Sequence, residues 1–373
     1  MPPLSTQQPP QIETPNYLLR TTVAVLALAL VGTASYFGYE SYKKTRPVNK
    51  KPNQTYLNLK QNESFREAQA ALIRKDYEAA LANYKKVPYG DTSEYSFLQH
   101  EIANALLNIN RMQGIDAFSN IIASPSINSQ TKGYAVNALA RTYSSSHEQN
   151  ILDTLKKLSL GWSTLTPTPP LIQDFIAAES YNDAYITLLE IGSAYYPIMD
   201  SEMRLAFAYA KKARDAKNKN NTKDFELYKQ KAVEKIKSGD SDPNNTKLSE
   251  NLSWMLPLAL NRKAMTLELL QYLGENTEDP AYYFEQALNL SKIQNINVQP
   301  FIIFHYSTFL MKTGGNTQKI TSLLQQIVQY KDTSDVTAFK EFTKNAYKNN
   351  EVINIQDLDA LAKIYPPFGE IIR

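Results

Sequence analysis

Residues 63–88, ESFREAQAALIRKDYEAALANYKKVP, decide the fold of this chain. Their apolar side chains recur every three or four positions, which is the period of a helix that buries one face. The apolar residues of the two predicted helices are Ala68, Ala71, Leu72, Ala80, Leu81, Tyr84 and Val87. The polar turn Lys75–Asp76–Tyr77 separates the helices, and Pro88 closes the second because proline lacks a backbone N–H. The stretch therefore predicts a helical hairpin.

The helical period continues from residue 63 towards the carboxyl end of the chain. Breaks rich in Pro, Gly, Ser and Asn separate the helical blocks at residues 88–91, 124–126, 167–170, 239–245, 274–280, 297–300 and 314–315. The alternation typical of half-buried strands is not evident, and the chain holds only 12 Gly for tight turns. We expect an all-α fold, with the glycines at 314–315 forming a left-handed helix cap. Residues 357–372, which include Pro366 and Pro367, are expected to form a capping helix and tail.

The predicted hairpin resembles the tetratricopeptide repeat (TPR), a helical hairpin of 34 residues. Small side chains at Ala68, Ala71 and Ala80 let the two helices approach closely, and Tyr77 and Tyr84 can fill the space towards a neighbouring hairpin. The residue at the family's usual glycine position is Ala68. Segments 102–122, 206–236, 282–288 and 304–327 resemble the pattern more weakly. The resemblance implies an α-solenoid of TPR-like hairpins over residues 62–373, and the alternative is an irregular bundle of unrelated amphipathic helices.

The amino-terminal part of the chain predicts a membrane anchor. Residues 1–16 hold five prolines among polar residues, so we expect a disordered tail. Residues 17–42 are expected to form a transmembrane helix, because residues 21–39, TTVAVLALALVGTASYFGY, carry no charge and would span about 28 Å as a helix. Residues 43–61 are rich in Lys and Asn and contain two prolines, and we expect them to be a flexible linker.

Two other interpretations of residues 21–39 are a cleaved signal peptide, because Gly32 and Ala34 precede Ser35, and a buried core helix. The long proline-rich leader and the flanking polar segments favour a retained anchor. Arg20 precedes the span and five Lys or Arg residues follow it within residues 43–51, which by the positive-inside rule favours a cytoplasmic domain. The short leader and the Asn-, Ser-, Thr- and Tyr-rich composition favour an extracytoplasmic domain, which is the side we expect.

Composition excludes several classes of site. The net charge of +3 comes from 40 basic and 37 acidic residues, a balance that does not suggest a nucleic-acid-binding protein. Cysteine is absent, and the three histidines, His100, His147 and His305, are far apart and outside any HExxH pattern. No GxSxG or Walker-type phosphate loop occurs either. We expect no catalytic, metal or cofactor site and no enzymatic activity.

The remaining candidate residues favour structural roles. Asp174, Glu179 and Glu190 could serve as paired carboxylates of an all-α hydrolase of cell-envelope glycans, but they are better explained as solvated helix faces. The basic run from Lys211 to Lys219 is interpreted as a solvated helix end. Some TPR proteins grip a terminal carboxylate with Lys and Asn on their inner helices. The corresponding positions in residues 63–88 hold Phe65 and Gln69, so this clamp is not supported there.

These observations predict a single-pass membrane protein whose solenoid binds a protein partner without catalysing a reaction. The anchor would concentrate the partner at the membrane, and the linker would set the reach. The sequence assigns no contact residues to the partner. The alternatives are the glycan hydrolase and a structural subunit whose solenoid packs against copies of itself.

Overall fold

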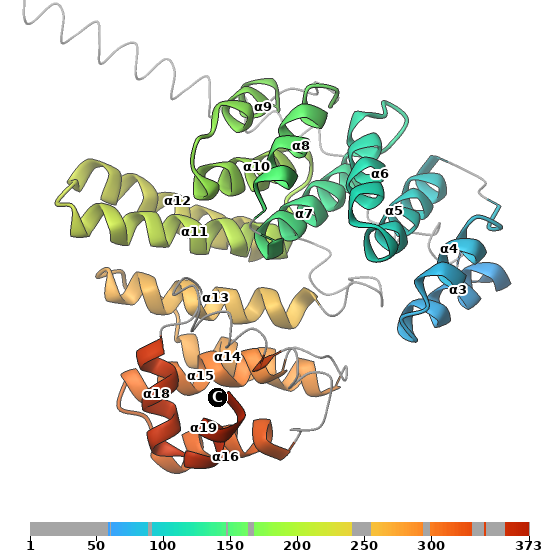
Figure 1. The fold of residues 1–373 in the computed structure, drawn as a ribbon. Helices are drawn as coiled ribbons and strands as arrows, with labels where there is room; N and C mark the ends of the chain where they lie inside the picture. Colours follow the sequence, from blue (N-terminus) through green and yellow to red (C-terminus); the bar gives the residue numbers. More distant parts are fainter. Residues whose placement is uncertain are drawn as a thin grey trace, which may run out of the picture. The chain divides into compact units, whose positions relative to one another are not determined.

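A computed structural model describes residues 59, 61–88, 92–146, 148–162, 168–240, 255–293, 299–329, 339–340 and 355–372. The chain divides into two units, 1–54 and 55–373, and every described residue belongs to the second. The described residues form sixteen helices and no strand (Figure 1). The expected all-α class is therefore confirmed, and the arrangement is compatible with a helical solenoid.

The helices lie in the following order along the chain. They are α3 (Glu63–Ile73), α4 (Tyr77–Tyr84), α5 (Thr92–Ile109), α6 (Arg111–Ala123), α7 (Ser129–Ser146), α8 (Gln149–Ser159), α9 (Thr168–Ala177), α10 (Tyr181–Tyr195), α11 (Met199–Asn218), α12 (Thr222–Asp240), α13 (Met255–Tyr272), α14 (Pro280–Ile293), α15 (Gln299–Lys312), α16 (Thr317–Gln329), α18 (Ile355–Ile364) and α19 (Pro366–Ile372).

The first hairpin forms where the sequence predicts it. Asn62 caps α3 by accepting a hydrogen bond from the backbone N–H of Phe65 at 3.0 Å, and Asp76 caps α4 through Ala79 at 3.1 Å. Such caps satisfy N–H groups that the first turn of a helix leaves without a partner. Lys75 adopts a left-handed conformation, with a φ of 61°, and reverses the chain between the two helices.

Consecutive helices pack in pairs over most of the chain: α3 with α4, α5 with α6, α11 with α12, α13 with α14, and α15 with α16. The exception is α7, which packs chiefly against α10, with α8 and α9 inserted between them in sequence (Figure 1). If α7 and α10 are treated as a pair, the helix pairs follow one another in a single series along the chain. First helices contact one another between α5 and α7, α11 and α13, and α13 and α15. At the other two junctions the second helix of one pair contacts the first helix of the next, α4 with α5 and α10 with α11.

Two clusters of buried apolar residues hold the helices together. The smaller one joins α3, α4 and the start of α5 around Phe65 and Tyr84, whose ring centroids are 5.8 Å apart. Leu59, in the predicted linker, is buried in the same cluster. The larger cluster runs from α5 to α19. Burial of apolar area on this scale is the main favourable contribution to folding.

Glycines permit two of the closest helix contacts. A Cβ on Gly114 of α6 would lie 2.2 Å from the Cα of Leu107 on α5, so only glycine fits there. A Cβ on Gly133 of α7 would lie 2.9 Å from the Cβ of Tyr196, just after α10. The pairs α5–α6 and α7–α10 therefore approach one another at glycine positions.

Four sequence-based boundaries are corrected by the structure. Residues 168–170 and 299–300 begin helices α9 and α15, because proline is accepted in the first turn, where the N–H has no helical partner. Gly239 lies inside α12, where a Cβ would come within 2.5 Å of the Met203 side chain. Residues 355–372 form two short helices, α18 and α19, rather than one helix and a tail. At Gly314 the left-handed cap is confirmed by a φ of 71°.

The predictions for residues 1–16 and 17–42, and that for the linker 43–61 apart from Leu59 and Gln61, lie outside the described residues. Within the part of the chain that the structure describes, no helix combines the length and the apolar character needed to cross a membrane.

Candidate functional site

The most highly charged buried region of the described chain surrounds Asp200, in the first turn of α11. One carboxylate oxygen, Oδ1, accepts a hydrogen bond from Nη1 of Arg262 on α13 at 2.7 Å. The other, Oδ2, accepts one from Nε of Arg204, one turn further along α11, at 2.8 Å. Asn137 on α7 donates a longer hydrogen bond to Oδ2 at 3.4 Å. Side chains from three helices therefore meet at one carboxylate.

A third arginine, Arg141 on α7, lies within electrostatic range of this carboxylate. Burial alone would raise the pKa of Asp200, but Arg204, Arg262 and Arg141 outweigh it and hold that pKa well below its usual range. Burial lowers the pKa of Arg141 to about 10. We call Asn137, Arg141, Asp200, Arg204 and Arg262 the Asp200 cluster.

The cluster is carried by the first helices of successive pairs, α7, α11 and α13, and Tyr185 of α10 extends it. Arg204 donates a hydrogen bond from Nη1 to the Tyr185 hydroxyl at 3.2 Å. The side chains of Asp200 and Arg204 are 2 % and 10 % exposed, whereas that of Arg262 is 22 % exposed. The cluster is therefore closed around Asp200 and reaches the surface at Arg262.

A neighbouring polar contact joins α13 to α15. The Asn261 amide donates a hydrogen bond to Nδ1 of His305, with 2.9 Å between the two nitrogens. With Nδ1 acting as the acceptor, the ring proton of a neutral histidine lies on Nε2. Burial, followed by the charges of Arg262 and Lys312, lowers the pKa of His305 to about 4, so the ring is neutral at pH 7.

Two further contacts show the same arrangement of residues at different places in the series. Tyr209 of α11 donates a hydrogen bond to Glu190 of α10, and Lys231 of α12 lies over the Tyr209 ring at 5.1 Å. In the later set, Tyr306 of α15 donates to Glu285 of α14 at 2.7 Å, and Lys319 of α16 lies over the Tyr306 ring at 5.0 Å. The repeated pattern indicates equivalent positions in the two pairs.

The residues of the first hairpin are held by packing and hydrogen bonds. Phe65 is buried against Tyr84 and Phe97. Gln69 donates hydrogen bonds to the Tyr84 hydroxyl and to Glu101 of α5, and Tyr84 donates to the same Glu101 oxygen at 3.1 Å. Tyr84 thus fills the space towards the next hairpin, as predicted.

The histidines have different surroundings. His100 is buried on α5 against the rings of Phe118 and Tyr134, and its Nδ1 lies 3.3 Å from the Glu101 carboxylate, a contact that sequence reasoning missed. His305 belongs to the α13–α15 contact, and His147 lies outside the described residues. In the described part of the chain, no group of three or more His, Asp or Glu side chains is placed to hold a metal ion.

The candidate carboxylates and the basic run are spread over different environments. Asp174 is exposed on α9, whereas Glu179 is exposed in the connection between α9 and α10 and not on a helix face. Glu190 is bound by Tyr209 as described above. Lys217 and Lys219 end α11 in solvent as predicted, but Lys212 is an exception, because it contacts Asp183 at 2.6 Å.

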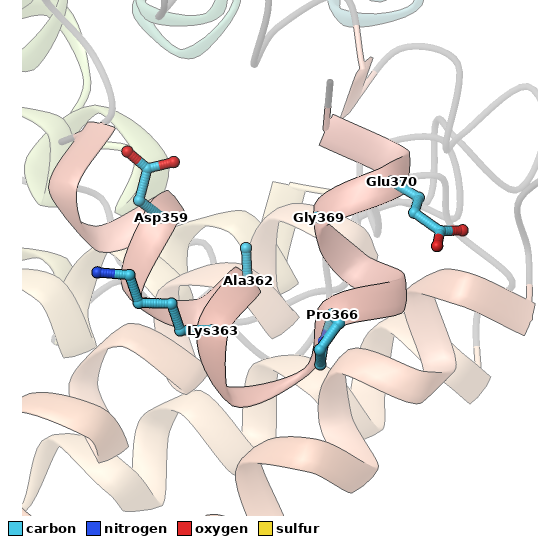
Figure 2. Close-up of a pocket in the computed structure, with 6 residues that line it drawn as sticks. All are labelled: Asp359, Ala362, Lys363, Pro366, Gly369 and Glu370. Atoms are coloured by element: carbon cyan, nitrogen blue, oxygen red, sulfur yellow. The ribbon is translucent and has the colours of Figure 1, made fainter.

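A shallow cavity of about 440 Å³ lies between α18 and α19. Its charged lining residues are Asp359 and Lys363 on α18 and Glu370 on α19 (Figure 2). In Figure 2 the side chain of Glu370 points away from those of Asp359 and Lys363. The two carboxylates therefore do not converge on a common point, as the acid and base of a hydrolase would.

No protein-family model matches this chain, and no curated protein matches it.

Sequence reasoning did not identify the Asp200 cluster. The only local signal is the spacing of four residues between Asp200 and Arg204, which places both on one face of a helix. Arg262 lies 62 residues further along the chain, and only tertiary packing brings it to Asp200.

Proposed function

We propose that this chain is a membrane-anchored, non-catalytic binding protein that recognises a protein partner through the first helices of its successive pairs. The observation that carries the proposal is the Asp200 cluster, which contains arginines from α7, α11 and α13 and reaches the surface at Arg262. Arginines that are held in place are typical of protein recognition surfaces, because the planar fork of the guanidinium loses little freedom on binding.

The proposal includes a TPR-like organisation of the hairpins. It is supported by the fit of residues 63–88 to one hairpin with a buried alanine seam at Ala68, Ala71 and Ala80. It is also supported by the repeated Glu–Tyr–Lys contacts at Tyr209 and Tyr306. In stacked repeats of this kind, each unit contacts its neighbours and the series offers an extended surface to a peptide or helix.

The anchor at residues 21–39 remains part of the proposal because nineteen uncharged residues match the thickness of a bilayer core. We propose an extracytoplasmic domain, although the Lys and Arg distribution favours the opposite side. Fusion of a reporter that is active only outside the cytoplasm to the carboxyl end of the intact chain tests this orientation. Activity of a cytoplasm-only reporter at the same position would reverse the assignment.

Partner binding is tested with the full-length tagged chain, extracted from the membranes of its own cells in mild detergent. We expect a complex of fixed stoichiometry that survives size-exclusion chromatography, with its mass measured by light scattering. A particle that contains only copies of this chain would contradict the proposal and favour the self-associating structural subunit.

A further inference from the structure

We propose that Arg204 and Arg262, oriented by Asp200, form a binding site for an oxyanion carried by a bound protein partner, either a carboxylate or a phosphoryl group. This inference rests on the proposed protein-binding function and names the chemistry of its anchoring contact.

The donors of the two arginines are only partly used. A guanidinium carries five N–H donors in a planar fork. Arg262 gives one hydrogen bond to Asp200, and Arg204 gives one to Asp200 and one to Tyr185. The described residues make no other hydrogen bond to either group. Arg262 therefore has N–H donors left in a side chain that is 22 % exposed, with its orientation fixed through Nη1.

Charge in the cluster is unbalanced. One carboxylate, that of Asp200, faces two arginines at hydrogen-bond distance. Positive charge that is removed from water without a full counter-charge is unfavourable, so the site gains free energy by accepting an anion. Burial and the charge of Arg204 lower the pKa of Arg262.

Nearby polar groups match the same chemistry. His305 is within electrostatic range of Arg262, and its Nδ1 is occupied by the Asn261 amide. Its remaining ring nitrogen, Nε2, is therefore an N–H donor. Arginine forks and neutral N–H donors form charge-assisted hydrogen bonds with carboxylate and phosphate oxygens.

The test uses the purified full-length chain in detergent, with thermal unfolding followed by circular dichroism. Sodium glutarate and sodium phosphate are compared with sodium chloride at equal ionic strength. We expect glutarate or phosphate to raise the unfolding temperature of the wild type by about 2 °C or more above the chloride control. The larger of the two shifts assigns the oxyanion to a carboxylate or to a phosphoryl source.

Two variants make the test specific. R262Q removes the partly exposed fork, and we expect it to lose the anion-dependent shift. D200N removes the internal counter-charge and frees both arginines, so it should unfold at a lower temperature in chloride but show a shift at least about twice that of the wild type. The control E148Q alters an exposed ion pair with Arg111 and should respond like the wild type.

Equal shifts in wild type, D200N and R262Q, or no shift beyond chloride in wild type and D200N, would overturn the inference. If R262Q does not fold, the comparison of D200N with the wild type still tests the site, because the larger anion-dependent shift expected of D200N requires a folded chain. The outcome is separate from that of partner binding. If anions stabilise the chain but no partner complex is found, the proposed function is contradicted and the oxyanion site is not. If R262Q forms the partner complex as well as the wild type does, the oxyanion site is contradicted and the proposed function is not.

Discussion

Arg262 and Asp200 lie 62 residues apart in sequence, yet Nη1 of Arg262 donates a 2.7 Å hydrogen bond to Oδ1 of Asp200. This contact joins α13 to α11, and Asn137 joins α7 to the same carboxylate. The Asp200 cluster therefore connects first helices from three pairs, at the position where we propose that a partner binds.

Removal of Arg262 should destabilise the folded chain. We expect R262Q to lower the free energy of unfolding by about 1.5 kcal/mol, because Asp200 loses one charge-assisted hydrogen bond but keeps that from Arg204. Urea unfolding of the full-length chain measures the change. The matched control is E148Q, since Arg111 and Glu148 are 50 % and 47 % exposed, and it should change the free energy by less than about 0.5 kcal/mol. Equal effects of the two substitutions would contradict the structural role of the cluster.

Gly114 should be intolerant of any side chain. We expect Gly114→Ala to cost about 2 kcal/mol or more, because the added Cβ meets the backbone of Leu107 and forces α5 and α6 apart. The comparison is Gly161→Ala, where the nearest atom to the added Cβ is 3.6 Å away. Thermal unfolding checks both substitutions, and an unfolding temperature for Gly114→Ala no lower than that for Gly161→Ala would refute the close approach.

The two Glu–Tyr–Lys contacts should have similar energies if their positions are equivalent. We expect Tyr209→Phe and Tyr306→Phe each to cost about 1 kcal/mol, the typical net value of a hydrogen bond, and to add in the double variant. Tyr282→Phe is the control, because Tyr282 is 55 % exposed. If the control substitution costs as much as the other two, the hydrogen bonds to Glu190 and Glu285 do not account for the losses.

His305 should make stability depend on pH. Its pKa is about 4 in the folded chain and about 6.5 without the fold, so the unfolded state takes up the proton more readily. Stability is therefore fully present above pH 6.5 and falls as the pH drops from 6.5 towards 4. His305→Gln keeps an acceptor for Asn261 and removes this titration. Chemical denaturation at pH 7 and pH 5 should show a larger loss for the wild type than for His305→Gln.

Glu268 has the opposite sign, because burial raises its pKa and its contribution grows as the pH falls. Glu268 is present in both the wild type and His305→Gln, so the difference between their free energies of unfolding isolates the effect of His305. If the difference in the free energy of unfolding between the wild type and His305→Gln is the same at pH 7 and pH 5, the neutral, buried state of His305 is contradicted.

The sequence predicts the helices well because the three- to four-residue period of the core is local information. Phe65, Ala68 and Ala71 lie on one face of α3 and are all buried. Prolines caused the errors at α9 and α15, because the same residue that ends one helix can begin the next. The insertion of α8 and α9 between α7 and α10 was also missed, since pairing between distant helices leaves no periodic signal.

The candidate site was less predictable. Asp200 and Arg204 share a helix face, and this spacing is visible in the sequence, but it is common on solvated helices. What distinguishes the pair is burial beneath α7 and α13, and the arrival of Arg262 from another helix. These properties follow from tertiary packing, which no motif in the chain encodes.

The most direct test of partner binding is a photo-cross-linking scan of the full-length chain in its own cells. Leu258 and Met265 lie one turn before and one turn after Arg262 on α13, and Leu227 is exposed on α12. A photo-reactive residue is placed at each position in turn, and adducts are identified by mass spectrometry. We predict that one protein is cross-linked at Leu258 and Met265 and not at Leu227. Adducts at Leu227 alone, or none at either α13 position, would contradict it.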